Sequence, residues 1–314
     1  MRYNYWQMKT KQKWFWICFV AALLAAPNAL MLRHTSETLD PLLINAVRFG
    51  LAGLVFLPML IKDVPRLVRS KKAFLKLLAA GLALAIAGVT YIIAIGNAPA
   101  SYVSIIYLLS PIMLVIYARR LSRERMSSRA IAGIIIAAVG AMLVVVLPLA
   151  KTTGGEFVFY PIATIAALVS MLSYPATVVL TKDINKRFRV HILSIVSFSS
   201  LLTALVSLGL WGVSHSTQAV VISTIDIWSL LYAGLIVLGL SRALTLRGYK
   251  YVSTPTLGSL FYVESFLAVI LPVVVLNEKL SVEMIAGGCL ILLGVYAIEH
   301  HRSAHHKYHH VIRT

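Results

Sequence analysis

The sequence predicts an all-α integral membrane protein with ten transmembrane helices, arranged as two inverted five-helix repeats. Three observations lead to this fold class: an apolar composition, long uncharged segments, and a one-sided distribution of basic residues. Hydrophobic residues make up 59% of the 314 residues and charged residues 13%, whereas an average soluble domain is nearer half apolar and one quarter charged. A soluble protein of this composition would have too little polar surface, so that class is excluded.

The uncharged segments set the number of spans. A hydrocarbon core of about 30 Å needs about 20 helical residues to cross it, and the uncharged segment 77–118 is too long for one crossing. Its Gly96-Asn97-Ala98-Pro99 run predicts a turn. Only helices and closed barrels satisfy their backbone in lipid, and these segments lack the period-2 alternation of barrel strands, so helices are predicted. The ten spans are 14–32, 41–61, 74–95, 101–118, 130–148, 160–181, 191–212, 227–247, 253–275 and 282–299.

Basic residues fall almost entirely on one side of such a bundle. With the N-terminus inside, the internal segments hold 23 Lys and Arg residues, whereas the external segments hold only Arg33, Lys151 and Lys279. This split follows the positive-inside rule, and an error of one span would destroy it because every later loop would change sides. Ten spans and two cytoplasmic termini are therefore predicted together. The same rule accounts for the net charge of +18, so no nucleic-acid partner is predicted.

The order of these segments predicts the domain organisation. Residues 1–32 have a basic start and an apolar run, but the run is longer than a signal-peptide core and further spans follow, so it is predicted as the first helix. The predicted parts are a cytoplasmic N-terminal segment 1–13, a first five-helix repeat 14–148, an external linker 149–159, a second five-helix repeat 160–299 and a His-rich cytoplasmic tail 300–314.

The two halves resemble each other at an offset of 154 residues. Glu124 corresponds to Glu278 and Gly133 to Gly287 at that offset, and each pair follows an apolar helix that opens with small residues. Five spans per half place the second copy upside down relative to the first. Secondary transporters use such inverted repeats to alternate access around a site near the midplane.

Several short motifs, in this order, resemble a known family. They are Ala46-Val47-Arg48-Phe49, the stretch that ends at Pro111, the Leu276-Asn277-Glu278-Lys279-Leu280 turn, and Gly287, Gly288 and Gly294 of the last span. With them the chain resembles the EamA-type ten-helix members of the drug/metabolite transporter superfamily. The resemblance implies export of amino acids or related metabolites. Two departures bear on the substrate more than on the fold: Ala25-Ala26-Pro27-Asn28 stands where the family often has Trp-Gly before Asn, and Glu264-Ser265 where it often has Pro.

Glu264 is the acidic residue that lies deep in a predicted span, near the middle of 253–275. A lone carboxylate there costs several kcal/mol unless it is protonated or paired. It is interpreted either as a substrate-ammonium partner or proton carrier, or as half of a structural ion pair with Arg242. The hairpin of spans 227–247 and 253–275 puts the two residues at depths that differ by about 6 Å, which long side chains bridge. Alternatively, Arg242 meets a substrate carboxylate, which suits an amino acid or organic acid.

The remaining candidates are Arg48 and a set of uncharged polar residues. Arg48 is predicted either to snorkel to the external surface or to act in gating. Ser110 corresponds to Glu264 at the 154-residue offset, and Tyr107 precedes it by one helical turn on the same face. Tyrosines near span ends also suit an aromatic belt. The other candidate cavity residues are Asn97, Tyr91 and Tyr262.

The tail holds six of the nine histidines. Paired histidines can bind zinc, but a solvated tail is the preferred interpretation, so neither a metal site nor a cofactor is predicted. Cys18 and Cys289 lie in apolar segments and predict no disulfide framework.

A secondary transporter, most simply an exporter of small polar or amphipathic metabolites, is the leading functional hypothesis. It would sit in the bacterial inner membrane as a monomer or homodimer, with lipid and substrate as partners and with proton or exchange coupling. The chain has no Walker motif, so ATP does not drive it directly. A multidrug or nucleotide-sugar carrier is the alternative. The third hypothesis is a non-transport membrane protein or an intramembrane enzyme. An enzyme is disfavoured because the sequence lacks His-Glu-x-x-His and paired intramembrane acids.

Overall fold

The computed structural model describes residues 2–122, 132–133, 135–136, 139–140, 143, 160–214, 222–248, 251–252, 254–294 and 296. All regular secondary structure in these residues is helical. The helices of the first half are α1 (Arg2–Ala25), α2 (Asn28–Thr35), α3 (Pro41–Val55), α4 (Leu57–Arg69), α5 (Lys71–Asn97), α6 (Ala100–Tyr107) and α7 (Ser110–Ser122). Those of the second half are α10 (Pro161–Phe188), α11 (Ile192–Val213), α12 (Thr224–Leu231), η1 (Tyr232–Ser241), α13 (Arg242–Gly248) and α14 (Thr254–Val275), followed by the apolar helix Val282–Gly294.

Five helices in the described ranges are long and apolar enough to cross a membrane, and the bent pair α3–α4 brings the number to six. Three shorter apolar helices, Ala100–Leu114, Phe266–Val275 and Val282–Gly294, fall within other predicted spans. The all-helical membrane architecture is therefore confirmed. Most of the predicted fifth span, the external linker and the His-rich tail lie outside the described residues.

Prolines break two of the predicted spans. The predicted span 41–61 is not one straight helix, because α3 ends at Val55 and α4 continues at an angle of 74°. Pro58 explains the break: it has no N–H to bond the carbonyl of Leu54, and its ring would clash with that carbonyl. In the same way the predicted span 101–118 divides into α6 and α7 just before Pro111, which places Tyr107 and Ser110 on either side of the break.

The third irregularity is in the predicted span 227–247. It is one continuous helical segment, but its middle part, η1, is a ten-residue π-helix. π-Helical turns are rare and occur often at functional sites. η1 is directly followed by Arg242, so the rotation of this arginine about the helix axis differs from that expected of an α-helix.

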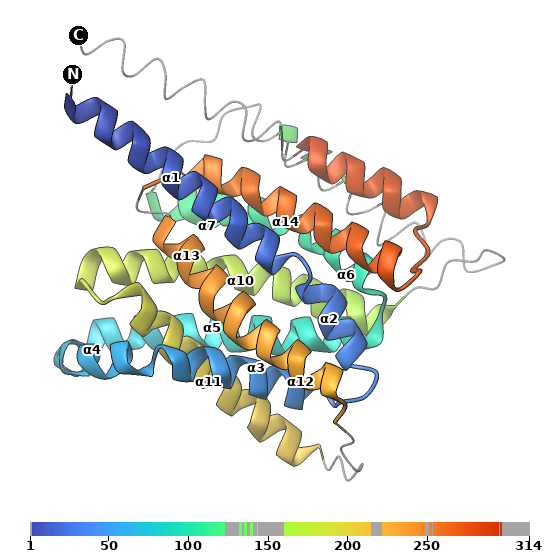
Figure 1. The fold of residues 1–314 in the computed structure, drawn as a ribbon, viewed down its shortest axis with the longest axis horizontal. Coiled ribbons are helices and arrows are strands. Elements are labelled where there is room, and N and C mark those ends of the chain that lie inside the picture. Colours follow the sequence, from blue (N-terminus) through green and yellow to red (C-terminus); the bar gives the residue numbers. More distant parts are fainter. Residues whose placement is uncertain are drawn as a thin grey trace.

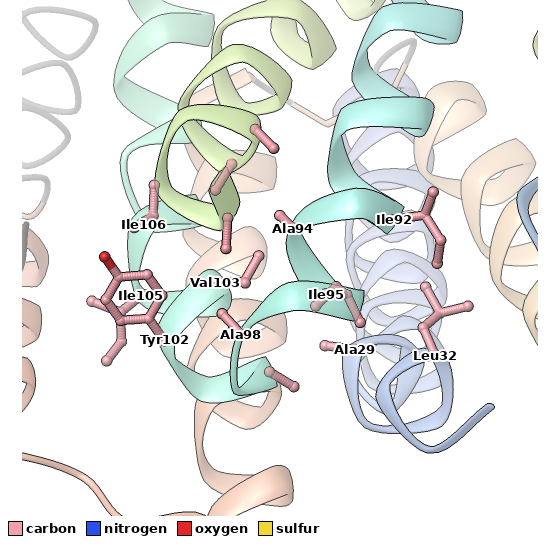
Figure 2. Close-up of a cluster of buried hydrophobic side chains, with 14 of the residues drawn as sticks. Ala29, Leu32, Ile92, Ala94, Ile95, Ala98, Tyr102, Val103, Ile105 and Ile106 are labelled. Atoms are coloured by element: carbon pink, nitrogen blue, oxygen red, sulfur yellow. The ribbon is translucent and has the colours of Figure 1, made fainter. Parts of the chain in front are cut away.

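The halves are packed against each other throughout the bundle. α5 packs along the length of α10, and α11 packs on both α3 and α5, so helices of the first half have their main partners in the second (Figure 1). A buried apolar cluster fills one end of the bundle: Ile92 of α5 lies beside Leu32 of α2, and Ala98 lies beside Val103 of α6 (Figure 2). These contacts fix the ends of the helices that carry the polar residues described below.

Polar contacts tie the helix ends near this cluster. Glu278 accepts hydrogen bonds from the backbone N–H groups of Ala100 and Ser101, both at 2.9 Å, and so caps the first turn of α6. Arg33 Nη1 donates to the carbonyls of Ile95 and Gly96 at the last turn of α5. Glu278, in the turn 276–280 of the second half, therefore links the second half to α6 of the first half.

A close backbone approach leads to the first prediction. A Cβ placed on Gly140 would lie 2.6 Å from the carbonyl oxygen of Gly287 and 2.8 Å from the amide nitrogen of Ile291. Backbone atoms cannot yield as a flexible side chain would, so we expect Gly140→Leu to destabilise the protein by about 3 kcal/mol or more. Gly209→Leu is the matched control, because nothing lies within 4 Å of a Cβ there. Melting temperatures in detergent compare the two; equal values would contradict this helix contact.

Candidate functional site

A cavity of about 190 Å³ opens between helices of both halves. In the first half, α3, α5, α6 and α7 and the ends of α1 and α2 contribute to its wall, and in the second half α10, η1, α13 and α14 do so. The wall is mostly apolar, with a limited set of polar side chains. These are Asn28, Arg48, Tyr91, Tyr107, Ser110, Tyr174, Ser241, Arg242, Thr245 and Glu264.

Six of the eight predicted site residues line this cavity, namely Arg48, Tyr91, Tyr107, Ser110, Arg242 and Glu264. Asn97 is not in its wall: it lies exposed at the end of α5, where its Nδ2 donates to the Ile93 carbonyl at 2.8 Å. The side chain of Tyr262 is outside the described part of the chain. The structure thus brings together the three charged candidates, although they are far apart in the sequence.

The side-chain amide of Asn45 holds Arg48 inside the bundle through hydrogen bonds. Its Nε and Nη2 donate to Asn45 Oδ1 at 3.1 and 2.8 Å, and Asn45 Nδ2 donates to Ser207 Oγ at 2.7 Å. The residue is 2% exposed. The expectation that Arg48 snorkels to the external surface is wrong, since two of its donors are fixed in the interior. Its guanidinium carbon lies 5.0 Å from the Phe49 ring centroid and 5.9 Å from that of Tyr91, so aromatic faces offset part of the cost of burial.

Arg242 stands at the first position of α13 and is 9% exposed. Its Nη1 is buried and has no hydrogen-bond partner. The guanidinium carbon lies 5.9 Å from the Tyr174 ring centroid, a contact that leaves Nη1 free for a further partner. An unpartnered buried guanidinium donor costs several kcal/mol, and such a group in a cavity wall is a strong candidate for ligand binding.

A structural ion pair between Arg242 and Glu264, one of the interpretations of these residues, is not formed between these two described side chains. Ion pairs between described side chains join Asp63 to Arg66, and Asp183 to Lys76 and Arg187, all away from the cavity. The prediction compared depths along two helices and took both as α-helical. η1 precedes Arg242 and changes the direction in which this side chain points around the helix axis. A comparison of depths in the membrane does not include that direction.

The tyrosines form part of the cavity wall and not an outer belt. The rings of Tyr91 and Tyr107 meet edge to face, with centroids 4.9 Å apart. The Tyr107 hydroxyl hydrogen-bonds Ser170 Oγ, which in turn donates to the Ala87 carbonyl at 2.6 Å. This chain of contacts joins α6, α10 and α5 at the cavity. The aromatic-belt interpretation does not hold for Tyr91 or Tyr107.

Sequence reasoning missed four polar cavity residues, Asn28, Tyr174, Ser241 and Thr245, and two of them, Asn28 and Tyr174, carry a signal in the sequence. Asn28 Oδ1 is buried without a hydrogen-bond partner. Asn28 and Tyr174 are each next to a proline: Pro27 lies between α1 and α2, and Pro175 lies inside the continuous helix α10. A polar residue beside an intramembrane proline was therefore the signal that could have found both, because broken helices in transporters often adjoin the site.

Comparison with known protein families decides which fold family this is. The sequence profile of the EamA-like transporter family matches residues 12–146 and, a second time, residues 161–299. The chain belongs to the EamA-like transporter family. Membership makes this EamA-like protein a membrane transporter of the drug/metabolite type, and the double match confirms that the chain consists of two related halves. Arg48 belongs to the first matched segment, and Arg242 and Glu264 belong to the second.

A comparison with solved structures agrees with this fold. A structure described only as "Crystal structure of protein" superposes on the EamA-like protein with a TM-score of 0.63 at 21% sequence identity, covering 91% of this chain and 96% of that chain. At this identity the likeness concerns the fold alone. No match was found among curated proteins.

Proposed function

We propose that this EamA-like protein is a secondary transporter that exports small metabolites bearing a carboxylate, such as amino acids, by alternating access around the central cavity. The observation that supports this proposal is a cavity with two arginines and one glutamate, Arg48, Arg242 and Glu264, with no ion pair among them. Small-molecule sites are typically apolar cavities with a few placed polar groups, as here.

The charges of the wall complement an amino acid. A guanidinium binds a carboxylate through two parallel hydrogen bonds, and buried arginines are strongly stabilised by such a partner. Glu264, the only carboxylate among the described residues of the wall, can then accept a substrate ammonium group or carry a proton. With Glu264 ionised the three side chains sum to one positive charge, so an organic acid fits as well.

A ligand thermal-shift panel on the purified protein tests the substrate class. We expect amino acids and small organic acids to raise the melting temperature, and amines, nucleotides and sugars to have little effect, because only the former bring an acceptor to the arginines. The tyrosine wall would equally suit a flat cation. Stabilisation by aromatic amines or nucleotide sugars without any by carboxylates would instead favour the multidrug or nucleotide-sugar alternative.

The proposed topology has ten spans with both termini in the cytoplasm of a bacterium, and repeats bounded at 14–148 and 160–299. Cysteine labelling from either side of the membrane tests it. We expect cysteines at Lys71 and Lys186 to react from inside, and cysteines at Lys151 and Lys279 from outside, because the positive-inside split requires it. Labelling of Lys71 and Lys279 from the same side would contradict the ten-span arrangement.

A further inference from the structure

α4 does not continue the direction of the helix before it. α3 and α4 meet at an angle of 74°, and α4 has 13 residues, or about 20 Å at 1.5 Å per residue. That length cannot cross a hydrocarbon core of about 30 Å. Figure 1 places α4 at the end of the bundle where the N-terminal end of α1 also lies. α4 is therefore a short helix turned aside at one end of the transmembrane bundle.

One face of α4 is attached to the start of α11. Asp63 Oδ2 accepts hydrogen bonds from the His191 backbone N–H at 2.7 Å and from Ser194 Oγ at 2.8 Å. Leu67 is buried in an apolar cluster with Leu77 and Ile195. These contacts fix the rotation of α4 about its own axis and hence the directions of its two other faces.

One of these free faces is apolar. Ile61, Val64 and Val68 are 61%, 44% and 76% exposed. Their spacing of three and four residues makes them one stripe on the helix. Single exposed apolar residues are ordinary, whereas a continuous stripe on a helix at the end of a membrane bundle requires an apolar neighbour.

The other free face is basic. Lys62, Arg66 and Arg69 are exposed and also have a spacing of three and four residues, so their stripe is turned by about 130° from the apolar one. Lys71 and Lys72 follow directly, and the only acidic residue in the segment 57–72 is Asp63, which Arg66 Nη1 contacts at 2.9 Å. The segment has an uncompensated positive charge next to an apolar stripe, which is the pattern of a helix lying in the membrane interface.

We propose that α4 is a binding site for anionic phospholipid. The apolar stripe of Ile61, Val64 and Val68 enters the acyl region of the leaflet, and Lys62, Arg66 and Arg69 bind the lipid phosphate groups. Basic residues next to a membrane surface each contribute about 1 kcal/mol to binding anionic lipid, or roughly fivefold in affinity. Since Asp63 joins α4 to the first turn of α11, lipid bound at α4 also stabilises the α4–α11 contact.

A lipid titration of the full-length protein in detergent tests this site. We expect phosphatidylglycerol to raise the melting temperature more than phosphatidylcholine with the same acyl chains. Lys62→Gln/Arg66→Gln/Arg69→Gln should raise the half-maximal phosphatidylglycerol concentration by more than about tenfold. The control Lys9→Gln/Lys11→Gln/Lys13→Gln removes the same charge from the N-terminal segment and should respond like wild type. An equal loss in the control would mean diffuse attraction to basic segments and would overturn the proposal, as would equal stabilisation of wild type by the two lipids.

A second measurement does not depend on the triple variant. Spin labels are attached at Val68→Cys or at Arg69→Cys, in a protein with Cys18→Ala and Cys289→Ala, reconstituted in phosphatidylglycerol-containing liposomes. We expect the label at 68 to be the more accessible of the two to oxygen, which concentrates in the acyl region. We expect the label at 69 to be the more accessible of the two to a water-soluble nickel complex. The same accessibility at both positions would exclude an interfacial α4.

Discussion

Glu264→Gln is expected to abolish transport and to leave the fold intact. Gln has nearly the shape of Glu and still forms hydrogen bonds, but it cannot ionise, so it removes the charge that a substrate ammonium group or a proton would need. Hydrogen bonds to a charged group contribute about 1.5–3 kcal/mol, so a loss of roughly 10- to 100-fold in flux is the minimum expected. Since no ion pair joins Glu264 to Arg242 in the described structure, the melting temperature should change little.

Yield, melting temperature and liposome flux together separate the outcomes for Glu264. If the variant melts much earlier and the double change Glu264→Gln/Arg242→Gln restores stability, the two residues do balance each other in the membrane, and Glu264 is structural. A stable Glu264→Gln protein with full flux would remove Glu264 from the mechanism altogether.

The two arginines are expected to respond differently to replacement by Met, although both are buried in the same cavity wall. Arg242→Met should weaken carboxylate binding by roughly 100-fold while the protein melts at or above the wild-type temperature. The reason is that Arg242 Nη1 has no partner, so its removal relieves a desolvation cost. Arg48→Met should weaken binding and also lower stability, because Asn45 Oδ1 loses both of its donors.

Binding isotherms and melting curves of the two variants provide the test. Arg48→Met serves as the matched control for a buried arginine with a structural role. If Arg242→Met destabilises the protein as much as Arg48→Met does and substrate affinity is unchanged, Arg242 is a packing residue and the carboxylate site must lie elsewhere.

The charged residues of the candidate site could be predicted from the sequence because charged residues are rare in membrane spans. In apolar spans, Arg48, Arg242 and Glu264 have no solvent to stabilise them, and a lone charge there needs a functional or structural reason. The cavity that the structure shows contains all three. A different signal predicted the two repeats: the offset of 154 residues that aligns Glu124 with Glu278.

The local geometry could not be predicted in the same way, because helices were taken as regular. The break at Phe56 follows from Pro58, and a proline near a span end permits either an uninterrupted helix or a bend. η1 has no sequence signal as distinctive as a proline, and it determines how Arg242 is rotated. Asn97 was included because it is polar, but it belongs to the turn that ends α5, where its side chain bonds its own helix.

Counterflow in liposomes tests whether this protein is a secondary transporter for carboxylate-bearing metabolites. Purified wild-type protein is reconstituted with a high internal concentration of the amino acid or organic acid that most stabilises it, and a trace of the same radiolabelled compound is added outside. We expect the label to accumulate transiently above its equilibrium level, and we expect no accumulation without internal substrate or in Arg242→Met. No accumulation of any such compound by folded wild-type protein, or equal accumulation by Arg242→Met, would contradict this proposal.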